Sequence, residues 1–129
     1  MIVVDASAVV SALVDSGPAG QWCQERLEHH DLAAPAILPV EVANVLRRAE
    51  QSRMLSSETA AQAFADLMAL PVIHFPFEAV AERVWDLRGS VTAYDAWYVA
   101  VAEGLEVPLI TLDVRLVRAA GAACQILTP

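Results

Sequence analysis

The sequence contains no lysine, and all eight of its basic residues are arginine. A P-loop, which holds nucleotide phosphates, requires a lysine within a GxxxxGK[ST] motif, and that motif is absent. The chain therefore does not bind nucleotides in the manner of a P-loop enzyme. Any contact with phosphate groups has to come from arginine side chains or from a bound metal ion.

Cysteine and histidine are also scarce. Cys23 and Cys124 are far apart in the sequence and form no CxxC pair. We expect two small core residues in a reducing compartment, with a disulfide between them as the alternative. The three histidines match neither an HExxH motif nor the ligand spacing of a zinc site. A metal ion bound by this chain would therefore have oxygen ligands.

Long apolar runs are absent, although 57% of the residues are hydrophobic. No run approaches the roughly 20 residues needed to cross a membrane. Residues 1–5 have the pattern of a strand and lack the basic region of a secretory signal, so we expect a cytoplasmic protein. The hydrophobic excess indicates a well-filled core and leaves room for an oligomer interface.

The net charge of −8 disfavours a broad nucleic-acid surface, because non-specific binding to phosphates comes from clustered basic residues. This objection is only partial. A metal ion that neutralised four acids would halve the net charge, and the arginines could still gather locally.

The hydrophobic pattern alternates between short strands and helices, and 129 residues are enough for one domain. Strand patterns occur at 2–5, 32–34, 72–75, 108–112 and 124–127. Helical patterns cover 6–13, 17–27, 36–51, 56–69, 77–87, 92–104 and 114–120. This alternation implies parallel pairing with right-handed crossovers. The predicted fold class is α/β, a three-layer α/β/α domain with a central parallel sheet of four to five strands.

Two aspartates follow apolar runs that are typical of strands. Asp5 comes after residues 2–4, and Asp113 comes after residues 109–112. In an open α/β sheet, ligands bind at the carboxyl ends of the parallel strands, so the two acids are expected to meet in one crevice. Glu41 and Asp95 lie in the helical segments between them. Four carboxylates about 5 Å apart would repel one another by roughly 15 kcal/mol in total, so such a cluster either takes up protons or binds a cation.

Each of these acids also has a purely structural interpretation. Asp5 and Asp113 can cap the helices that follow them, and Glu41 can be a solvated helix residue. Asp95 lies three residues after Thr92, as in a capping box, where the helix dipole favours an acid. The functional interpretation depends on the joint placement of all four.

Four segments together resemble a family. They are 2–8 (IVVDASA), 39–48 (PVEVANVLRR), 87–96 (LRGSVTAYDA) and 108–116 (PLITLDVRL). In this order and spacing they resemble a PIN domain, that of a ribonuclease toxin of the VapC type from a toxin-antitoxin system. The resemblance covers nearly the whole chain, and none of the four family acids is missing.

The resemblance implies a metal-dependent endoribonuclease that hydrolyses phosphodiesters in single-stranded regions of structured RNA. Asp5, Glu41, Asp95 and Asp113 would be the catalytic acids that bind Mg²⁺, with Mn²⁺ as a substitute. Because Mg²⁺ usually keeps several waters, we expect Asp5 and Asp95 to be the closest ligands and the other two to act through water.

Other residues would support this site. Ser7, Asn44 and Thr111 are expected to hold waters or carboxylates in place. The candidates for contact with RNA are Tyr94 and Arg115, with Arg47 and Arg48 also near the acids in sequence. We expect the remaining large aromatic residues in the core or an interface, namely Trp22, Trp85, Trp97 and Tyr98. The implied partners are a second copy of the chain and a VapB-like antitoxin.

Two other functions remain open. One is a catalytically silent PIN-like module that binds or regulates a partner, although the complete acidic set counts against it. The other is a metal-dependent nuclease that acts on DNA, because one fold supports many chemistries.

Overall fold

A computed structural model describes residues 1–119 and 121–129. Its strands are short and its helices are longer, as the apolar pattern predicts. The elements, in chain order, are β1 (Ile2–Val4), α1 (Ala6–Val14), α2 (Pro18–His29), β2 (Leu32–Pro35), α3 (Leu38–Gln51), α4 (Ser57–Ala69), β3 (Val72–Phe75), the 3₁₀ helix η1 (Phe77–Ala79), α5 (Ala81–Asp86), α6 (Ala93–Leu105), β4 (Leu109–Ile110), α7 (Val114–Val117) and β5 (Ile126–Leu127).

The strands form one parallel five-stranded sheet in the order β3-β2-β1-β4-β5. The first strand of the chain is therefore the central one. Val3 pairs with Ala33 of β2 on one side and with Leu109 of β4 on the other. The predicted α/β class with a parallel sheet of four to five strands is confirmed.

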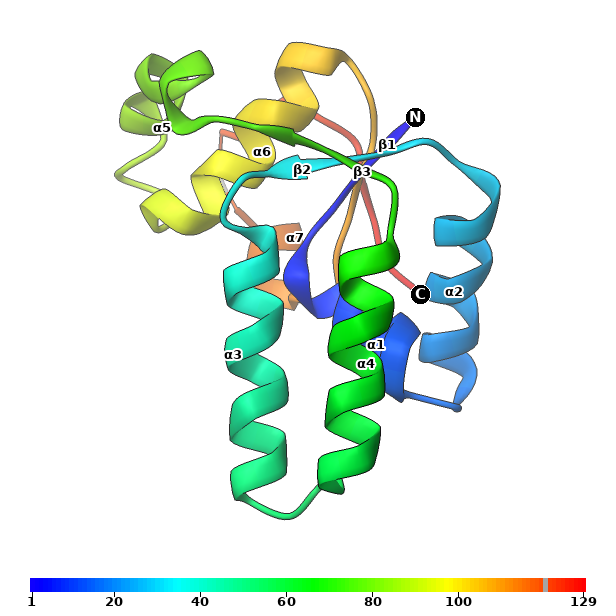
Figure 1. The fold of residues 1–129 in the computed structure, drawn as a ribbon. Coiled ribbons are helices and arrows are strands. Elements are labelled where there is room, and N and C mark those ends of the chain that lie inside the picture. Colours follow the sequence, from blue (N-terminus) through cyan, green and yellow to red (C-terminus); the bar gives the residue numbers. More distant parts are fainter. Residues whose placement is uncertain (120) are drawn as a thin grey trace.

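Helices flank this sheet (Figure 1). The helix α6 contacts β1, β2 and β4, while α1 packs against α2, α3 and α4. In Figure 1, α5 and α6 lie on one side of the sheet. The helices α3 and α4 pack side by side and extend away from the opposite side. The three central strands are buried along their whole length, which explains their apolar sequences.

Helix starts follow the expected capping chemistry. Ser56 and Thr92 accept hydrogen bonds from backbone N–H groups in the first turns of α4 and α6, as their side chains predict. Pro39 is tolerated in α3 because it lies in the first turn, where its missing N–H has no partner to lose.

Several boundaries differ from the predicted ones. The expected helix over 77–87 is interrupted at Val80, so that η1 and α5 are separate. The helix α6 passes through Gly104 and ends at Leu105, with Glu106 in the left-handed conformation at φ 57°. Strands β4 and β5 are shorter than predicted, and α7 ends at Val117. Residue 120, the predicted end of that helix, lies outside the described residues.

A partly exposed ion pair links α5, α6 and the segment that follows α7. The Arg83 guanidinium of α5 donates to Glu103 of α6 at 2.6 and 3.1 Å, and also to the carbonyl oxygen of Gly121 at 2.8 Å. Glu103 in turn accepts from the backbone N–H of Ala123. These contacts lower the pKa of Glu103, although its partial burial acts in the opposite direction.

Two other expectations concern cysteine and the membrane. Both cysteines are free thiols, with Cys23 buried and Cys124 half-buried, so no disulfide joins them. Within the described residues, none of the helices combines the length and the apolar character that a bilayer span requires.

Candidate active site

The order in which strands are added to the sheet reverses between β1 and β4. From β1 the chain builds β2 and β3 on one side, and later returns to place β4 and β5 on the other. The crevice outside the carboxyl ends of strands at such a switch point is where open α/β sheets bind ligands. Asp5 lies at the end of β1, and Thr111 lies at the end of β4.

Asp5 joins these two strand ends. Its Oδ1 accepts hydrogen bonds from Ser7 Oγ at 2.7 Å and from the backbone N–H of Ala8 at 3.0 Å. Its Oδ2 accepts from Thr111 Oγ1 at 2.5 Å. The bond to Ala8 makes Asp5 the N-cap of α1, so the structural interpretation is correct and does not exclude a place in the crevice.

The charge on Asp5 is disfavoured despite these bonds. The residue is only 7% exposed, and burial is the main cause that raises the pKa of its carboxyl group. Hydrogen bonds from Thr111, Ser7 and Ala8 act in the opposite direction, and the negative charge of Asp113 adds a smaller increase. Ser7 and Thr111, which the sequence predicts to hold the carboxylates in place, thus both contact Asp5.

Glu41 lies in the first turn of α3 and faces α6. Its Oε1 accepts a hydrogen bond from the hydroxyl of Tyr98 at 2.9 Å. Partial burial raises the pKa of Glu41, the bond from Tyr98 lowers it, and the charges of Asp95 and Asp5 raise it further. Glu41 is therefore an electrostatic neighbour of both aspartates.

Tyr98 is a site residue that the sequence analysis did not identify as one. It is 2% exposed, which confirms its expected place in the core, but its hydroxyl reaches into the crevice. Burial and the neighbouring Glu41 raise its pKa, so the hydroxyl stays protonated and donates. The available signal was its position three residues after Asp95, on the same face of α6.

Asp95 lies in the first turn of α6, where its backbone N–H donates to Thr92 Oγ1 at 3.2 Å. The expected capping arrangement is therefore present. Burial raises the pKa of the Asp95 carboxyl group, and the charge of Asp113 raises it further, while Arg115 lowers it.

Asp113 differs from the other three acids. Its Oδ1 accepts from the Arg115 backbone N–H, which caps α7, and both of its carboxylate oxygens accept from the Arg115 guanidinium, at 3.1 and 2.7 Å. These bonds lower the pKa of Asp113. Arg115, an expected RNA contact, thus forms an ion pair with an acid of the site, although its side chain is 84% exposed.

The four acids lie close enough for their charges to interact. Their charges interact in pairs, Asp5 with Asp113, Asp113 with Asp95, Asp95 with Glu41, and Glu41 with Asp5. All four stand at the first turn or the N-cap of a helix, where the helix dipole partly offsets their repulsion. Across the described part of the chain, no three Asp, Glu, His or Cys side chains stand at the spacing of metal ligands. Asp5, Glu41 and Asp113 each accept hydrogen bonds from other side chains.

The donor set fits a hard cation nevertheless. All four acids offer oxygen, which Mg²⁺ and Mn²⁺ prefer. Three of them have raised pKa values because burial and mutual repulsion leave their charge poorly compensated. A divalent ion would remove that penalty.

Two further expectations can be compared with the structure. Asn44 is exposed, and its Oδ1 accepts from Arg47 Nε at 3.1 Å. Within the described residues it forms no hydrogen bond with the four acids, so its expected supporting role is not seen in these contacts. Tyr94 is 60% exposed, as a residue that contacts RNA requires.

The tryptophans behave differently from one another. Trp22 and Trp97 are half-buried against the core, as expected. Trp85 is 67% exposed, so it does not lie in the core, and the expected alternative for it, an interface position, stays a prediction. Trp85 lies in the short helix α5, in which Val84 is the buried residue.

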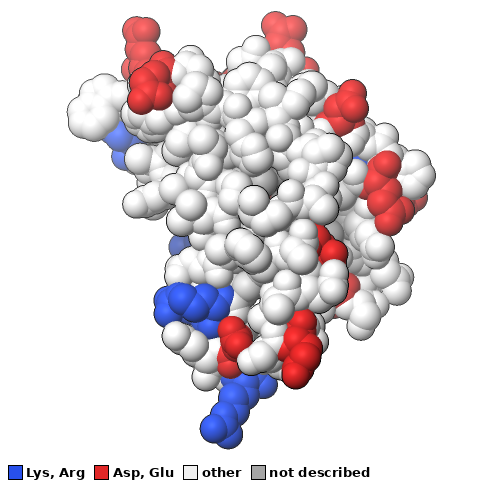
Figure 2. Space-filling model, in the orientation of Figure 1, with Lys and Arg blue, Asp and Glu red and all other residues white. Residues whose placement is uncertain are grey.

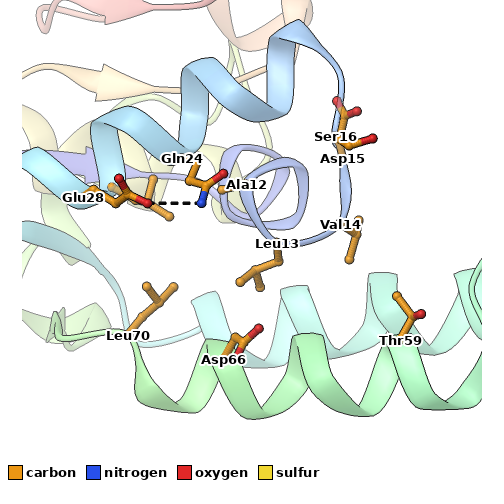
Figure 3. Close-up of a pocket in the computed structure, with 11 residues that line it drawn as sticks. Ala12, Leu13, Val14, Asp15, Ser16, Gln24, Glu28, Thr59, Asp66 and Leu70 are labelled. Carbon is orange, nitrogen blue, oxygen red and sulfur yellow. Dashed lines mark hydrogen bonds between the residues drawn. The ribbon is translucent and has the colours of Figure 1, made fainter.

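A separate hollow of about 510 Å³ lies between α1, α2 and α4 (Figure 3). Leu13 and Leu70 contribute apolar surface, while Asp15, Glu28 and Asp66 add acidic groups. Glu28 accepts a hydrogen bond from Gln24 at 3.1 Å within it. None of the four site acids lines this hollow, so it is distinct from the crevice.

The chain is similar to a known family and to known sequences. The family model described as "PIN domain" matches residues 2–122. The chain is 44% identical over 128 residues to ribonuclease VapC1 of Mycobacterium tuberculosis, covering 96% of this chain and 94% of that protein. It is 38% identical over 126 residues to ribonuclease VapC9 of the same organism, covering 98% and 96% respectively.

Solved structures share the fold. The crystal structure of VapC20 of Mycobacterium tuberculosis, described as a sarcin-ricin loop cleaving toxin, matches with a TM-score of 0.70 at 15% identity and full coverage of both chains. A toxin-antitoxin complex from Klebsiella pneumoniae matches with a TM-score of 0.67 at 21% identity, covering 100% of this chain and 98% of the other.

Proposed function

This chain belongs to the PIN domain family, and on that premise we propose that it is an RNA-cleaving toxin of the VapC type. The observation that carries the proposal is the set of four acids at one edge of the sheet, where Asp5 bridges the ends of β1 and β4. The similarity to ribonucleases VapC1 and VapC9 extends over nearly the whole chain and supports RNA as the substrate. We take residues 1–129 as a single PIN domain.

Asp5, Glu41, Asp95 and Asp113 are the residues that would hold Mg²⁺, or Mn²⁺ in its place. When bound, the ion would lower the pKa of a water molecule that it holds, and its own positive charge would stabilise the negative charge of the phosphodiester. Asp5 is fixed by Ser7 and Thr111, which hold the orientation of its carboxylate and limit its motion.

Glu41 and Asp113 differ in whether they can accept a proton. Among the described residues, both oxygens of Asp113 accept from Arg115, whereas only Oε1 of Glu41 accepts a side-chain hydrogen bond, which Tyr98 donates. Glu41 therefore has Oε2 available to accept a proton from the attacking water, and it is the better candidate for the general base. Tyr98 fixes the Glu41 carboxylate while it does so.

The partners follow from the same assignment. Structural neighbours of this chain include a toxin-antitoxin complex, which supports an antitoxin of the VapB kind as the protein that neutralises this one. We further propose that the toxin forms a homodimer.

The test is cleavage of single-stranded RNA by the purified chain with Mg²⁺ or Mn²⁺, compared with the Asp5→Asn variant. Loss of the carboxylate that bridges the two strand ends should lower the cleavage rate by more than about 100-fold. Asp66→Asn is the matched control, because Asp66 is an exposed aspartate on α4 that accepts a bond from Gln62 and lies away from the four acids.

Three results would contradict the proposal. A wild-type chain that binds an antitoxin tightly but cuts no RNA would support a silent binding module. Cleavage restricted to DNA would support a different nuclease. Full RNA cleavage by Asp5→Asn would show that the acids at the sheet edge are not the catalytic groups.

A further inference from the structure

An exposed tryptophan stands next to Arg88, one of the residues that line the hollow at Asp95. The ring of Trp85, near the end of α5, is 67% exposed. The guanidinium carbon of Arg88 lies 4.6 Å from the centre of this ring, and Arg88 Nη1 donates to the Trp85 carbonyl oxygen at 2.8 Å. The arginine therefore covers one face of the ring and holds it in place, while the opposite face is left to solvent.

A second pair in the chain shows that this exposure is particular to Trp85. The guanidinium of Arg26 lies 3.8 Å from the ring centre of Trp22 on α2. Trp22, however, is half-buried against the core, and Arg26 also contacts Glu25 at 3.5 Å. Among the described residues, Arg88 forms no ion pair with an acid, so its charge remains available.

Arg88 connects the ring to the acids. A hollow of about 480 Å³ is lined by Arg88, Thr92, Asp95 and Arg115 together with the loop before α6. One site acid and two arginines therefore share a single depression in the surface. In Figure 2, arginine side chains are visible on the left side and at the bottom of the molecule, and acidic side chains are visible at the top, on the right and near the bottom.

A flat aromatic surface next to an uncompensated cation is the combination that binds single-stranded nucleic acid. Bases stack on the ring, and the cation binds the backbone phosphate. A base within a duplex has no free face to offer, so this combination selects unpaired nucleotides.

We propose that Trp85 stacks an unpaired base of the RNA substrate and that Arg88 binds a backbone phosphate beside it, leading the strand through the hollow to Asp95. This inference rests on the proposed function, because it describes how the same site holds its substrate. Trp85 and Arg88 are binding residues here and take no part in the chemical step.

The test is steady-state cleavage, with Mg²⁺, of a single-stranded RNA of mixed sequence about 12 nucleotides long. Trp85→Ala should raise KM by about 5- to 100-fold, the usual effect of removing one stacking ring, and should leave kcat within about twofold. Trp85→Phe should keep most of the wild-type affinity because a stacking surface remains. Phe64→Ala is the matched control, since Phe64 is an aromatic residue on α4 that is 48% exposed and lies outside the proposed path.

Arg88 has its own readout. Arg88→Ala should raise KM and should reduce the slope of log KM against log salt by about 0.7, the value for one phosphate contact on a single strand. Arg26→Ala, which removes the other arginine that stacks on a tryptophan, should leave KM and this slope unchanged.

An unchanged KM in Trp85→Ala would overturn the inference. So would a fall in kcat at constant KM. Sedimentation that shows a wild-type dimer and a Trp85→Ala monomer would also overturn it, by placing the ring between two copies of the chain. These results leave the proposed function intact, whereas a wild-type chain that cuts no RNA overturns both.

Discussion

At the level of single residues, the crevice holds carboxylates in positions that disfavour their charge. Burial raises the pKa of Asp95, and the charge of Asp113 raises it further. An acid whose pKa is raised on folding binds its proton more tightly in the folded chain than in the unfolded chain. Its ionised form therefore lowers the stability of the folded state at neutral pH.

Asp95→Asn should accordingly stabilise the fold while it abolishes RNA cleavage. We expect the free energy of unfolding at pH 7 to increase by about 0.5–1 kcal/mol, or the melting temperature by about 2–4 °C. The gain should be present above the folded-state pKa of Asp95 and should decline as the pH falls through it, because protonated Asp95 is neutral, as is asparagine. Urea unfolding at several pH values measures this effect.

Glu58→Gln provides the control, because Glu58 is also an acid in the first turn of a helix, α4, but is exposed. Removal of its charge should only weaken the favourable interaction with the helix dipole, at a loss of about 0.3–1 kcal/mol. A loss of stability in both variants would show that the acids of the crevice are not in conflict with folding.

The acids themselves could be found from the sequence, because Asp5 follows an apolar run and strand ends meet at one edge of a parallel sheet. Tyr98 and Trp85 could not be assigned their roles in this way. Whether an aromatic side chain on a helix is buried depends on what packs against it, and Tyr98 faces Glu41 only because α6 lies against the start of α3. Trp85 is exposed although the residue before it, Val84, is buried, and the local sequence does not record which of the two faces the core.

At the level of elements, the contact between α1 and α2 depends on a glycine. A Cβ atom built on Gly20 would lie 1.8 Å from the carbonyl oxygen of Asp15, so only glycine allows the second helix to turn back this closely. Asp15 itself ends α1, and Gly20 is buried in the first turn of α2.

Gly20→Ala should therefore destabilise the protein by about 1–3 kcal/mol, because the backbone has to shift to relieve the overlap. Gly104→Ala is the matched control in α6, where an added Cβ meets no atom within 4 Å. There the substitution should stabilise by about 0.4–1 kcal/mol through its higher helix propensity. Chemical denaturation of both variants gives the comparison, and equal effects would contradict the close approach at Gly20.

Which elements form could be predicted better than where they end. Helices α3, α4 and α6 have caps and apolar faces that are visible in the sequence. Gly104 was an expected stop, but nothing forces a glycine to end a helix, and the left-handed turn occurs two residues later at Glu106. The interruption at Val80, where φ is −133° and ψ is 13°, is not recorded in the local apolar pattern.

At the level of the whole molecule, a chain of net charge −8 collects four of its acids around one crevice. A cation that binds only the folded state stabilises it in proportion to the logarithm of its concentration. The protein should therefore be more stable with a divalent ion than without one.

Adding Mn²⁺ or Mg²⁺ at 100 times its dissociation constant should raise the free energy of unfolding by about 2.7 kcal/mol, which corresponds to about 10 °C in melting temperature. The rise should be smaller at pH 5 than at pH 8, because protons compete with the ion for the carboxyl groups whose pKa is raised. Thermal unfolding with and without a chelator measures it. The Asp5→Asn variant should show little increase and Asp66→Asn the full increase; an equal increase in all three would place the bound ion elsewhere.

The central position of β1 has a consequence for the order in which the molecule is assembled. Asp5 is made before its partner, because the threonine that fixes it lies 106 positions later in the chain. A nascent chain that has emerged only as far as α6 has no β4, so the middle strand has a neighbour on one side alone. The site around Asp5 is therefore completed only after β4 and residue 111 have been made, and a translation product truncated before residue 111 is expected to be harmless to the cell that makes it.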